Sequence, residues 1–215
     1  IREADYPFGR GKYQIKEGVG KKKALNKKQL KAIANYSDGN KFTEFYRDLW
    51  LFIYFCNGIN VADLINLKFS DIQNGEISFI REKTKDRTRD TKRIYAPITP
   101  EMQSIIEKWG NNPRKSIYIF PFMKAGDDAW EHEKKKKNLT KHINDRMKVI
   151  GEKLNIGKIT TYVARHTYAT VLRNEGVPVS IISPMLGHTS ITTTEIYLAD
   201  LESENRARNA HLLSF

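Results

Sequence analysis

The stretch TYVARHTYATVLRNEGVPVSIISPMLGHTSITTTEIYL, residues 161–198, decides how the last third of the chain folds. Its first half has a helical pattern that Gly176 and Pro178 bring to an end. After this break the pattern predicts a helix, a turn and a further helix, over 179–186, 187–189 and 191–198. The end of the chain is therefore expected to be helical, with short turns between its helices.

Upstream of this stretch, the sequence predicts more helices around one small sheet. Helices are expected over 27–35, 42–56, 100–109 and 127–154, and a short amphipathic segment over 61–67. Alternating, β-branched residues predict strands over 76–80 and 93–98, joined through the polar, cationic stretch 81–92 as a hairpin with a charged tip. This arrangement indicates a mainly helical α+β domain with a small antiparallel β-sheet.

Length and composition exclude several classes of protein. A chain of 215 residues is within reach of one domain. Its longest apolar run, Leu49 to Cys56, is far shorter than the roughly 20 residues of a membrane span, so no membrane partner is expected. The single cysteine, Cys56, excludes a disulfide framework and fits a reducing cytoplasm. The sequence has no glycine-rich phosphate loop, no Gly-x-Ser-x-Gly elbow and no zinc spacing, so we expect neither a metal nor a cofactor.

The charge of the chain points to a polyanionic partner. Lys and Arg number 37 against 25 Asp and Glu, which gives a formal charge of +12. The surplus is concentrated in the stretches 12–31, 81–93 and 134–137. One such run is commonly a solvated face, but three in so basic a chain favour nucleic acid. The candidate DNA-binding residues are Lys21, Lys22, Lys23, Lys85, Arg87 and Arg89.

Three motifs in the last third resemble the catalytic half of the tyrosine recombinases, the phage-integrase family. They are ARHTYAT (164–170), NEGV (174–177) and MLGHTSITTTEIY (185–197), and their order and spacing agree over more than 30 residues. The resemblance assigns Arg165 to the second catalytic arginine, His188 to the third motif and Tyr197 to the nucleophile. It also implies the fold of a tyrosine recombinase catalytic domain, and it is strongest to integrases of mobile elements in Bacteroides-like bacteria.

The resemblance continues more weakly upstream, so that it spans about 25–198. The stretch NGINVADL (57–64) is similar to the first arginine motif, Gly-x-Arg-x-x-Glu-Leu. Asp63 stands at the position of the glutamate, as an orienting partner rather than a catalyst. Lys83 falls where the family has its β-hairpin lysine, and Lys85 is the alternative because it lies on the same side of an extended chain.

Two positions depart from the family pattern. Asn60 replaces the first arginine, and Tyr162 replaces the histidine before the second arginine. Losing one preorganised donor to a developing phosphate charge costs about 10² to 10³ in rate if nothing replaces it. We therefore expect another cation to supply part of the missing charge, and the candidates from the sequence are Arg87, Arg89 and Arg173.

The chemistry that the resemblance implies fits these residue types. A phenol has a pKa of about 10, so Tyr197 needs nearby positive charge or a base to become a nucleophile. Arg165 binds a phosphate with two donors of its rigid fork, and His188 donates a further hydrogen bond. Lys83 protonates the leaving 5′ oxygen. A covalent 3′-phosphotyrosine keeps the bond energy, so strands are cut and rejoined without ATP or a metal.

Three other interpretations stay open. One is a weakened or inactive recombinase-like module that binds DNA without cutting it, which the substitutions at Asn60 and Tyr162 make reasonable. Another is a basic RNA-binding or structural protein, and the third is a type IB topoisomerase with the same chemistry.

The organisation expected from the resemblance has three parts. Residues 1–24 are a linker or arm from a missing N-terminal core-binding domain, 25–198 are the catalytic domain, and 199–215 are a C-terminal segment that is exchanged between protomers. The expected partner is double-stranded DNA, on which the protein forms a homotetramer, while the fragment alone can be a monomer. The expected location is the bacterial cytoplasm, in association with the nucleoid.

Overall fold

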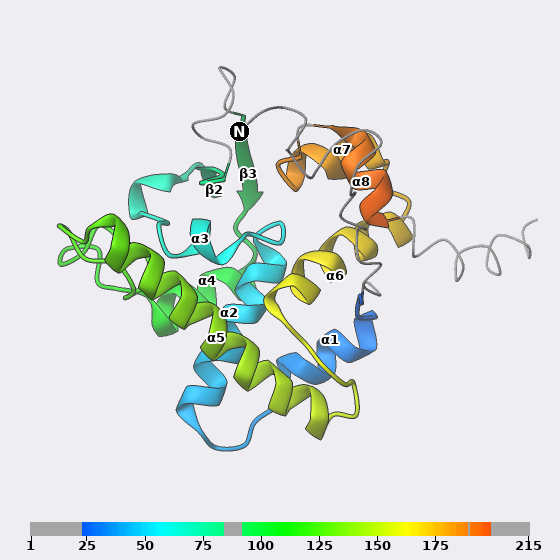
Figure 1. Cartoon of the computed structure of the whole chain (residues 1–215), viewed down its shortest axis with the longest axis horizontal. Coiled ribbons are helices and arrows are strands. Elements are labelled where there is room, and N and C mark those ends of the chain that lie inside the picture. The colour runs from blue at the N-terminus through cyan, green and yellow to red at the C-terminus, as the bar shows by residue number, and fades with distance from the viewer. Residues whose placement is uncertain (1–22, 84–91, 189, 199–215) are drawn as a thin grey trace, which may run out of the picture.

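The computed structural model describes residues 23–83, 92–188 and 190–198 (Figure 1). Its helices surround one small sheet, as the sequence predicts. In chain order the elements are α1 (Lys27–Ala34), α2 (Lys41–Phe55), α3 (Val61–Leu64), the 3-10 turn Phe69–Asp71, β1 (Ile72–Gln73), β2 (Glu76–Ile80), β3 (Arg93–Pro97), α4 (Pro100–Trp109), α5 (Ala129–Lys153), α6 (Thr161–Asn174), α7 (Val179–Met185) and α8 (Ile191–Leu198). None of the helices in the described ranges is long and apolar enough to cross a membrane.

Helix α2 runs through the centre of the core. It begins at Asn40, whose side chain accepts a hydrogen bond from the amide of Phe42, and its second half is buried over 49–53. It packs against α1, α4, α5 and α6, which explains why its apolar residues extend almost all round the helix. The indole of Trp50 is fully buried and donates to the carbonyl of Thr160, at the entrance to α6, over 2.8 Å.

The sheet has three antiparallel strands in the order β1-β2-β3. The predicted hairpin is its larger part, and Ile77 opposite Ala96 and Phe79 opposite Ile94 face the core. Strand β1 was not expected from the sequence, because two residues are too few to show an alternating pattern. Asn74 and Gly75, both with positive φ, form the tight turn from β1 to β2.

Two predicted helices have different limits in the structure. The segment expected over 61–67 is helical only as α3, because the amides of Asn66 and Leu67 bond three residues back and tighten the chain out of the α-helix. The helix expected over 127–154 is the continuous α5, which is shorter by two residues at its start and one at its end. Asp128 begins it with a capping box, and the side chains of Leu139, Ile143, Met147 and Ile150 attach it to the core at helical spacing.

Helices α6, α7 and α8 lie as the quoted stretch predicts. Their own small core consists of five buried residues, Tyr168, Ala169, Ile182, Leu186 and Leu198. Helix α7 also contacts β3, so the C-terminal helices lie beside the end of the hairpin (Figure 1). This arrangement brings the motifs of 161–198 next to those of 57–83.

Asn57 joins the end of α2 to both the sheet and α6. It has a left-handed backbone with φ of 52° and is buried. Its amide donates to the carbonyl of Tyr95 over 2.8 Å, and its side-chain oxygen accepts from the hydroxyl of Tyr168 over 2.8 Å. One side chain therefore holds three parts of the fold around the entrance to the 57–64 motif.

We predict that Asn57→Ala lowers the free energy of unfolding by about 2–5 kcal/mol, because each buried group that loses its partner costs about 1–3 kcal/mol. Asn138→Ala, at an exposed position inside α5, is the control and should change it by less than about 0.5 kcal/mol. Urea unfolding followed by circular dichroism measures both. Equal stabilities of the two variants would contradict the role given to Asn57.

Candidate functional site

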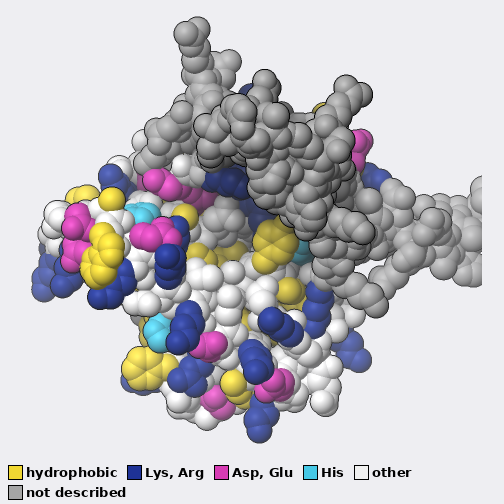
Figure 2. All heavy atoms as spheres, in the orientation of Figure 1, with side chains coloured by type: hydrophobic (Ala, Val, Ile, Leu, Met, Phe, Trp, Pro, Cys, Tyr) yellow, Lys and Arg dark blue, Asp and Glu magenta, His cyan; other side chains and the backbone are white. Residues whose placement is uncertain are grey.

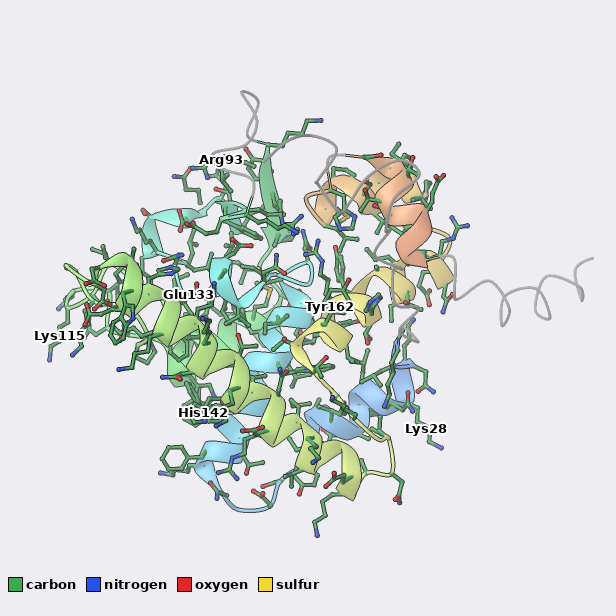
Figure 3. The ribbon with its side chains drawn as sticks, in the orientation of Figure 1. Lys28, Arg93, Lys115, Glu133, His142 and Tyr162 are labelled. Carbon is green, nitrogen blue, oxygen red and sulfur yellow. The ribbon has the colours of Figure 1, made fainter. Side chains whose placement is uncertain are left out.

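Six of the residues that the sequence singles out line one cleft of about 730 Å³. The cleft lies where α3, the end of β2, α5, the start of α6 and the turn after α7 meet. The residues from the sequence analysis that line it are Asn60, Asp63, Lys83, Tyr162, Arg165 and His188. Tyr162 is labelled in Figure 3, at the beginning of α6 near the middle of the molecule.

Arg165 is held at the base of the cleft by backbone carbonyls. It is only 5% exposed, and its Nη1 donates to the carbonyl of Gly58 over 2.8 Å while Nη2 donates to that of Leu186. Gly58 has a φ of +63°, and a Cβ there would lie 2.7 Å from the Cα of Arg165. Only glycine allows this close approach. The hydrogen bonds to Gly58 and Leu186 attach the loop after α2 and the turn after α7 to the same guanidinium.

His188 lies between Arg165 and helix α8. Its Nε2 is 3.3 Å from Nη2 of Arg165, and its Nδ1 is 2.8 Å from the hydroxyl oxygen of Thr194. Burial lowers the pKa of its imidazole from 6.5 to about 4, and the charges of Arg165 and Arg81 act in the same direction. The imidazole is therefore neutral at physiological pH.

Asp63 attaches the hairpin to α3. Its buried carboxylate accepts a hydrogen bond of 2.7 Å from the amide of Glu82, next to Lys83. Burial raises the pKa of the carboxyl, while the Glu82 amide, the charge of Arg81 and the side chain of Asn60 oppose this rise. These contacts fit the orienting role expected of Asp63, because they fix the chain that leads to Lys83.

Arg81 is a cleft residue that the sequence analysis did not single out. Its Nη1 donates to the carbonyl of Gly187 over 2.8 Å, and its charge acts on both Asp63 and His188. The signal that could have found it is its place two residues before Lys83, on the same side of an extended chain. Lys136, from the run 134–137 on α5, also lines the cleft and was not singled out.

Tyr162 and His166 form a contact at one side of the cleft. Their rings meet edge to face with centroids 4.5 Å apart. Tyr162 is 54% exposed, so its hydroxyl is within reach of a ligand, whereas His166 is 2% exposed. This burial agrees with the structural role that the sequence analysis gave to His166.

Several predicted residues do not join the cleft or cannot be located. Lys23 donates to the carbonyls of Ile156 and Lys158, in the loop between α5 and α6, and so lies away from it. Arg173 is exposed near the end of α6 and does not line the cleft, so it is not the substitute cation. Tyr197 belongs to α8, but its side chain is outside what the structure describes. The remaining candidates, Lys21, Lys22, Lys85, Arg87 and Arg89, also lie outside the described residues.

The cleft has the chemistry of an anion site. Four cations, Arg81, Lys83, Lys136 and Arg165, line it together with two carboxylates, Asp63 and Glu82. Figure 2 shows Lys and Arg side chains together with Asp and Glu side chains beside the grey residues. Within the described ranges no group of three His, Cys, Asp or Glu side chains could hold a metal ion. Arginine and lysine donors around a neutral histidine are suited to binding a phosphate group.

Comparison with known proteins finds one family. The model of the Phage integrase family matches residues 23–204. Tyrosine recombinase XerA of Pyrococcus furiosus is 28% identical over 177 residues, which cover 81% of this chain and 56% of XerA. Tyrosine recombinase XerC of Chlamydia caviae is 26% identical over 172 residues, which cover 79% of this chain and 52% of XerC. The chain thus spans about half the length of the curated relatives it matches.

Solved structures show the same fold. A crystal structure of XerA recombinase aligns with a TM-score of 0.57 at 19% identity, over 86% of this chain and 64% of that one. The XerH site-specific recombinase in a post-cleavage complex aligns with a TM-score of 0.60 at 17% identity, over 87% of this chain and 52% of that one. With a family model that matches most of its residues and neighbours that share its mainly helical fold, this chain belongs to the phage integrase family, the tyrosine recombinases.

Proposed function

We propose that the chain is the catalytic part of a site-specific DNA recombinase that cuts and rejoins strands through Tyr197. The observation that carries the proposal is the convergence of Arg165, His188 and Lys83 on one cationic cleft, from three separate parts of the sequence. Helix α8, which contains residue 197, is joined to the cleft by the contact between His188 and Thr194. The XerH structure, whose protein was solved bound to a palindromic difH substrate, supports duplex DNA as the ligand.

In the proposed reaction the phenolic oxygen of Tyr197 attacks the scissile phosphorus. A bond from this oxygen to phosphorus forms and the bond to the 5′ oxygen breaks, giving a 3′-phosphotyrosine and a free 5′ hydroxyl. The phenolic proton passes to a base or to water, and Lys83 gives a proton to the leaving oxygen. Attack by a second 5′ hydroxyl reverses these steps and joins the new strand.

The non-bridging oxygens of the phosphate are bound by fixed donors in this proposal. Arg165 is already oriented by Gly58 and Leu186, so little reorganisation is needed when the phosphate arrives. Asn60 has no charge to offer, and Arg81 lines the same cleft with its guanidinium held by Gly187. We therefore assign to Arg81 the charge that the family's first arginine would supply.

The rest of the organisation extends the proposal to the whole protein. Residues 1–24 would connect to an N-terminal core-binding domain, which fits the XerA and XerC relatives, of which the matched residues cover only 56% and 52%. Residues 199–215 would pass between protomers of a homotetramer on DNA. The protein would act in the bacterial cytoplasm on nucleoid DNA, as an integrase of a Bacteroides-like mobile element.

The first test of the function is the covalent intermediate. We expect the chain to become covalently attached to a nicked duplex of randomised sequence. The nick makes the cleaved fragment that carries the free 5′ hydroxyl short, so this fragment diffuses away and the strand cannot be rejoined. Denaturing electrophoresis would detect the adduct, and mass spectrometry would locate the phosphate on Tyr197. Tyr197→Phe should give no adduct because it lacks the nucleophilic oxygen.

Tyr95→Phe is the matched control, because Tyr95 is 54% exposed on β3 and does not line the cleft. It should form the adduct as the unaltered chain does. If the unaltered chain binds the duplex and never forms an adduct, the protein is the inactive DNA-binding module, and the enzymatic proposal is wrong.

Arg81 and Asn60 are tested together by a double-mutant cycle. Arg81→Ala should slow adduct formation by about 10² to 10³, the cost of one lost donor to the developing charge. Asn60→Arg should restore much of the rate in the Arg81→Ala background and change the unaltered chain little. Arg93→Ala removes a cation outside the cleft and is the control. If Asn60→Arg alone greatly increased the rate of adduct formation, Arg81 would not supply the charge of the family's first arginine.

His188 predicts how stability depends on pH. Its pKa is about 4 in the folded chain and 6.5 in ordinary surroundings, so between these values the unfolded chain binds a proton that the folded chain does not. The free energy of unfolding should therefore fall as the pH falls from 6.5 to 4, and the fall should be smaller in His188→Gln. Urea unfolding at several pH values measures this, and identical slopes for both proteins would refute it.

A further inference from the structure

The contacts of His188 determine which ring nitrogen holds its proton. A guanidinium has only donors, so Nε2, at 3.3 Å from Nη2 of Arg165, must act as an acceptor and carry no hydrogen. The proton of the neutral ring is then on Nδ1, which donates to the hydroxyl oxygen of Thr194 over 2.8 Å. The free protein thus holds His188 as the Nδ1–H tautomer.

Binding a phosphate requires the opposite tautomer. Phosphate oxygens accept hydrogen bonds, so an imidazole that donates to one through Nε2 must carry its proton there. Protonating both nitrogens instead would place a positive charge next to Arg165 and Arg81 in a half-buried position, and these two arginines already lower the pKa of the ring. A move of the proton from Nδ1 to Nε2 keeps the ring neutral.

Thr194 is able to serve both tautomers. A hydroxyl is donor and acceptor, so it accepts from Nδ1–H in the free protein and donates to a bare Nδ1 once the proton has moved. Thr194 is 0% exposed, whereas Thr192 and Thr193 before it are exposed. Because Thr194 is buried, its hydroxyl does not compete with water for Nδ1 of His188. Its short β-branched side chain has few rotamers, so the hydroxyl stays next to the ring.

The position of Thr194 in α8 adds a second consequence. It lies three residues before Tyr197, close to one helical turn. The bond to Thr194 therefore fixes the register of α8 against the histidine in both states of the ring.

We propose that Thr194 is a positioning residue that stabilises both tautomers of His188, so that the ring changes from acceptor to donor when the phosphate enters while α8 stays in place. The inference rests on the proposed function for the identity of the ligand. Its first half, the Nδ1–H tautomer bonded to Thr194, is a property of the free protein.

The test compares Thr194→Val, which keeps the shape without the hydroxyl, with Thr194→Ser, which keeps the hydroxyl. Thr193→Val is the control on the exposed face of the same helix. Long-range ¹H–¹⁵N NMR at pH 7 reports the tautomer of His188 in the free chain, and adduct formation on the nicked duplex reports the reaction. Thermal unfolding of each variant shows that it is folded.

We expect the Nδ1–H tautomer in the free chain, in Thr194→Ser and in Thr193→Val, and a change toward Nε2–H when saturating inorganic phosphate is added. Thr194→Val removes the acceptor of Nδ1–H and leaves only the contact with Arg165, so the Nδ1–H population in the free chain should fall, and the adduct should form about three- to tenfold more slowly, the effect of one neutral hydrogen bond. Thr194→Ser should stay within about twofold of the unaltered chain.

An Nε2–H ring in the free chain, or an Nδ1–H population in Thr194→Val as high as in the unaltered chain, would overturn the inference. So would an equal loss of rate in Thr194→Ser and Thr194→Val, since that would indicate a packing role. Failure of the proposed function looks different, because then no variant forms an adduct while the NMR comparison in the free chain still decides the role of Thr194.

Discussion

The structure depends on the buried guanidinium of Arg165 and on the carbonyls that hold it. Gly58 and Leu186 come from loops more than 100 residues apart, and both accept from this one side chain. A buried charge without such acceptors would be strongly destabilising, so the two loops and α6 are positioned together. The same contacts leave the arginine oriented beside His188 and ready for an anion. The hydrogen bonds of Arg165 therefore both stabilise the fold and orient the guanidinium in the cleft.

Much of the fold could be predicted because its signals are local. Asn26, Thr99 and Thr160 each begin a helix with a side-chain cap, and the limits of α4, α6 and α8 agree with the sequence pattern. The cleft was predictable for a different reason, since the spacing of Arg165, His188 and Tyr197 resembles a known family. That resemblance named these residues, and the described structure brings Arg165 and His188 together.

What the sequence did not reveal depends on contacts between distant residues. Arg81 is one of seven cations between residues 81 and 93, and Lys85 stands as close to Lys83 in the sequence as Arg81 does. Its place becomes clear only when the turn after α7 brings the carbonyl of Gly187 to it. Thr194 likewise stands in a run of three threonines, of which only one is buried. Burial and partners, not residue type, distinguish these side chains.

The small separate core under α7 and α8 has a consequence for motion. Five buried residues hold these helices, whereas α2 and its neighbours share a much larger cluster. Amide hydrogens in α7 and α8 should therefore exchange with solvent through local opening, at a lower free energy than those of α2. The helix that carries residue 197 can then open locally while α2 and the larger cluster around it stay folded.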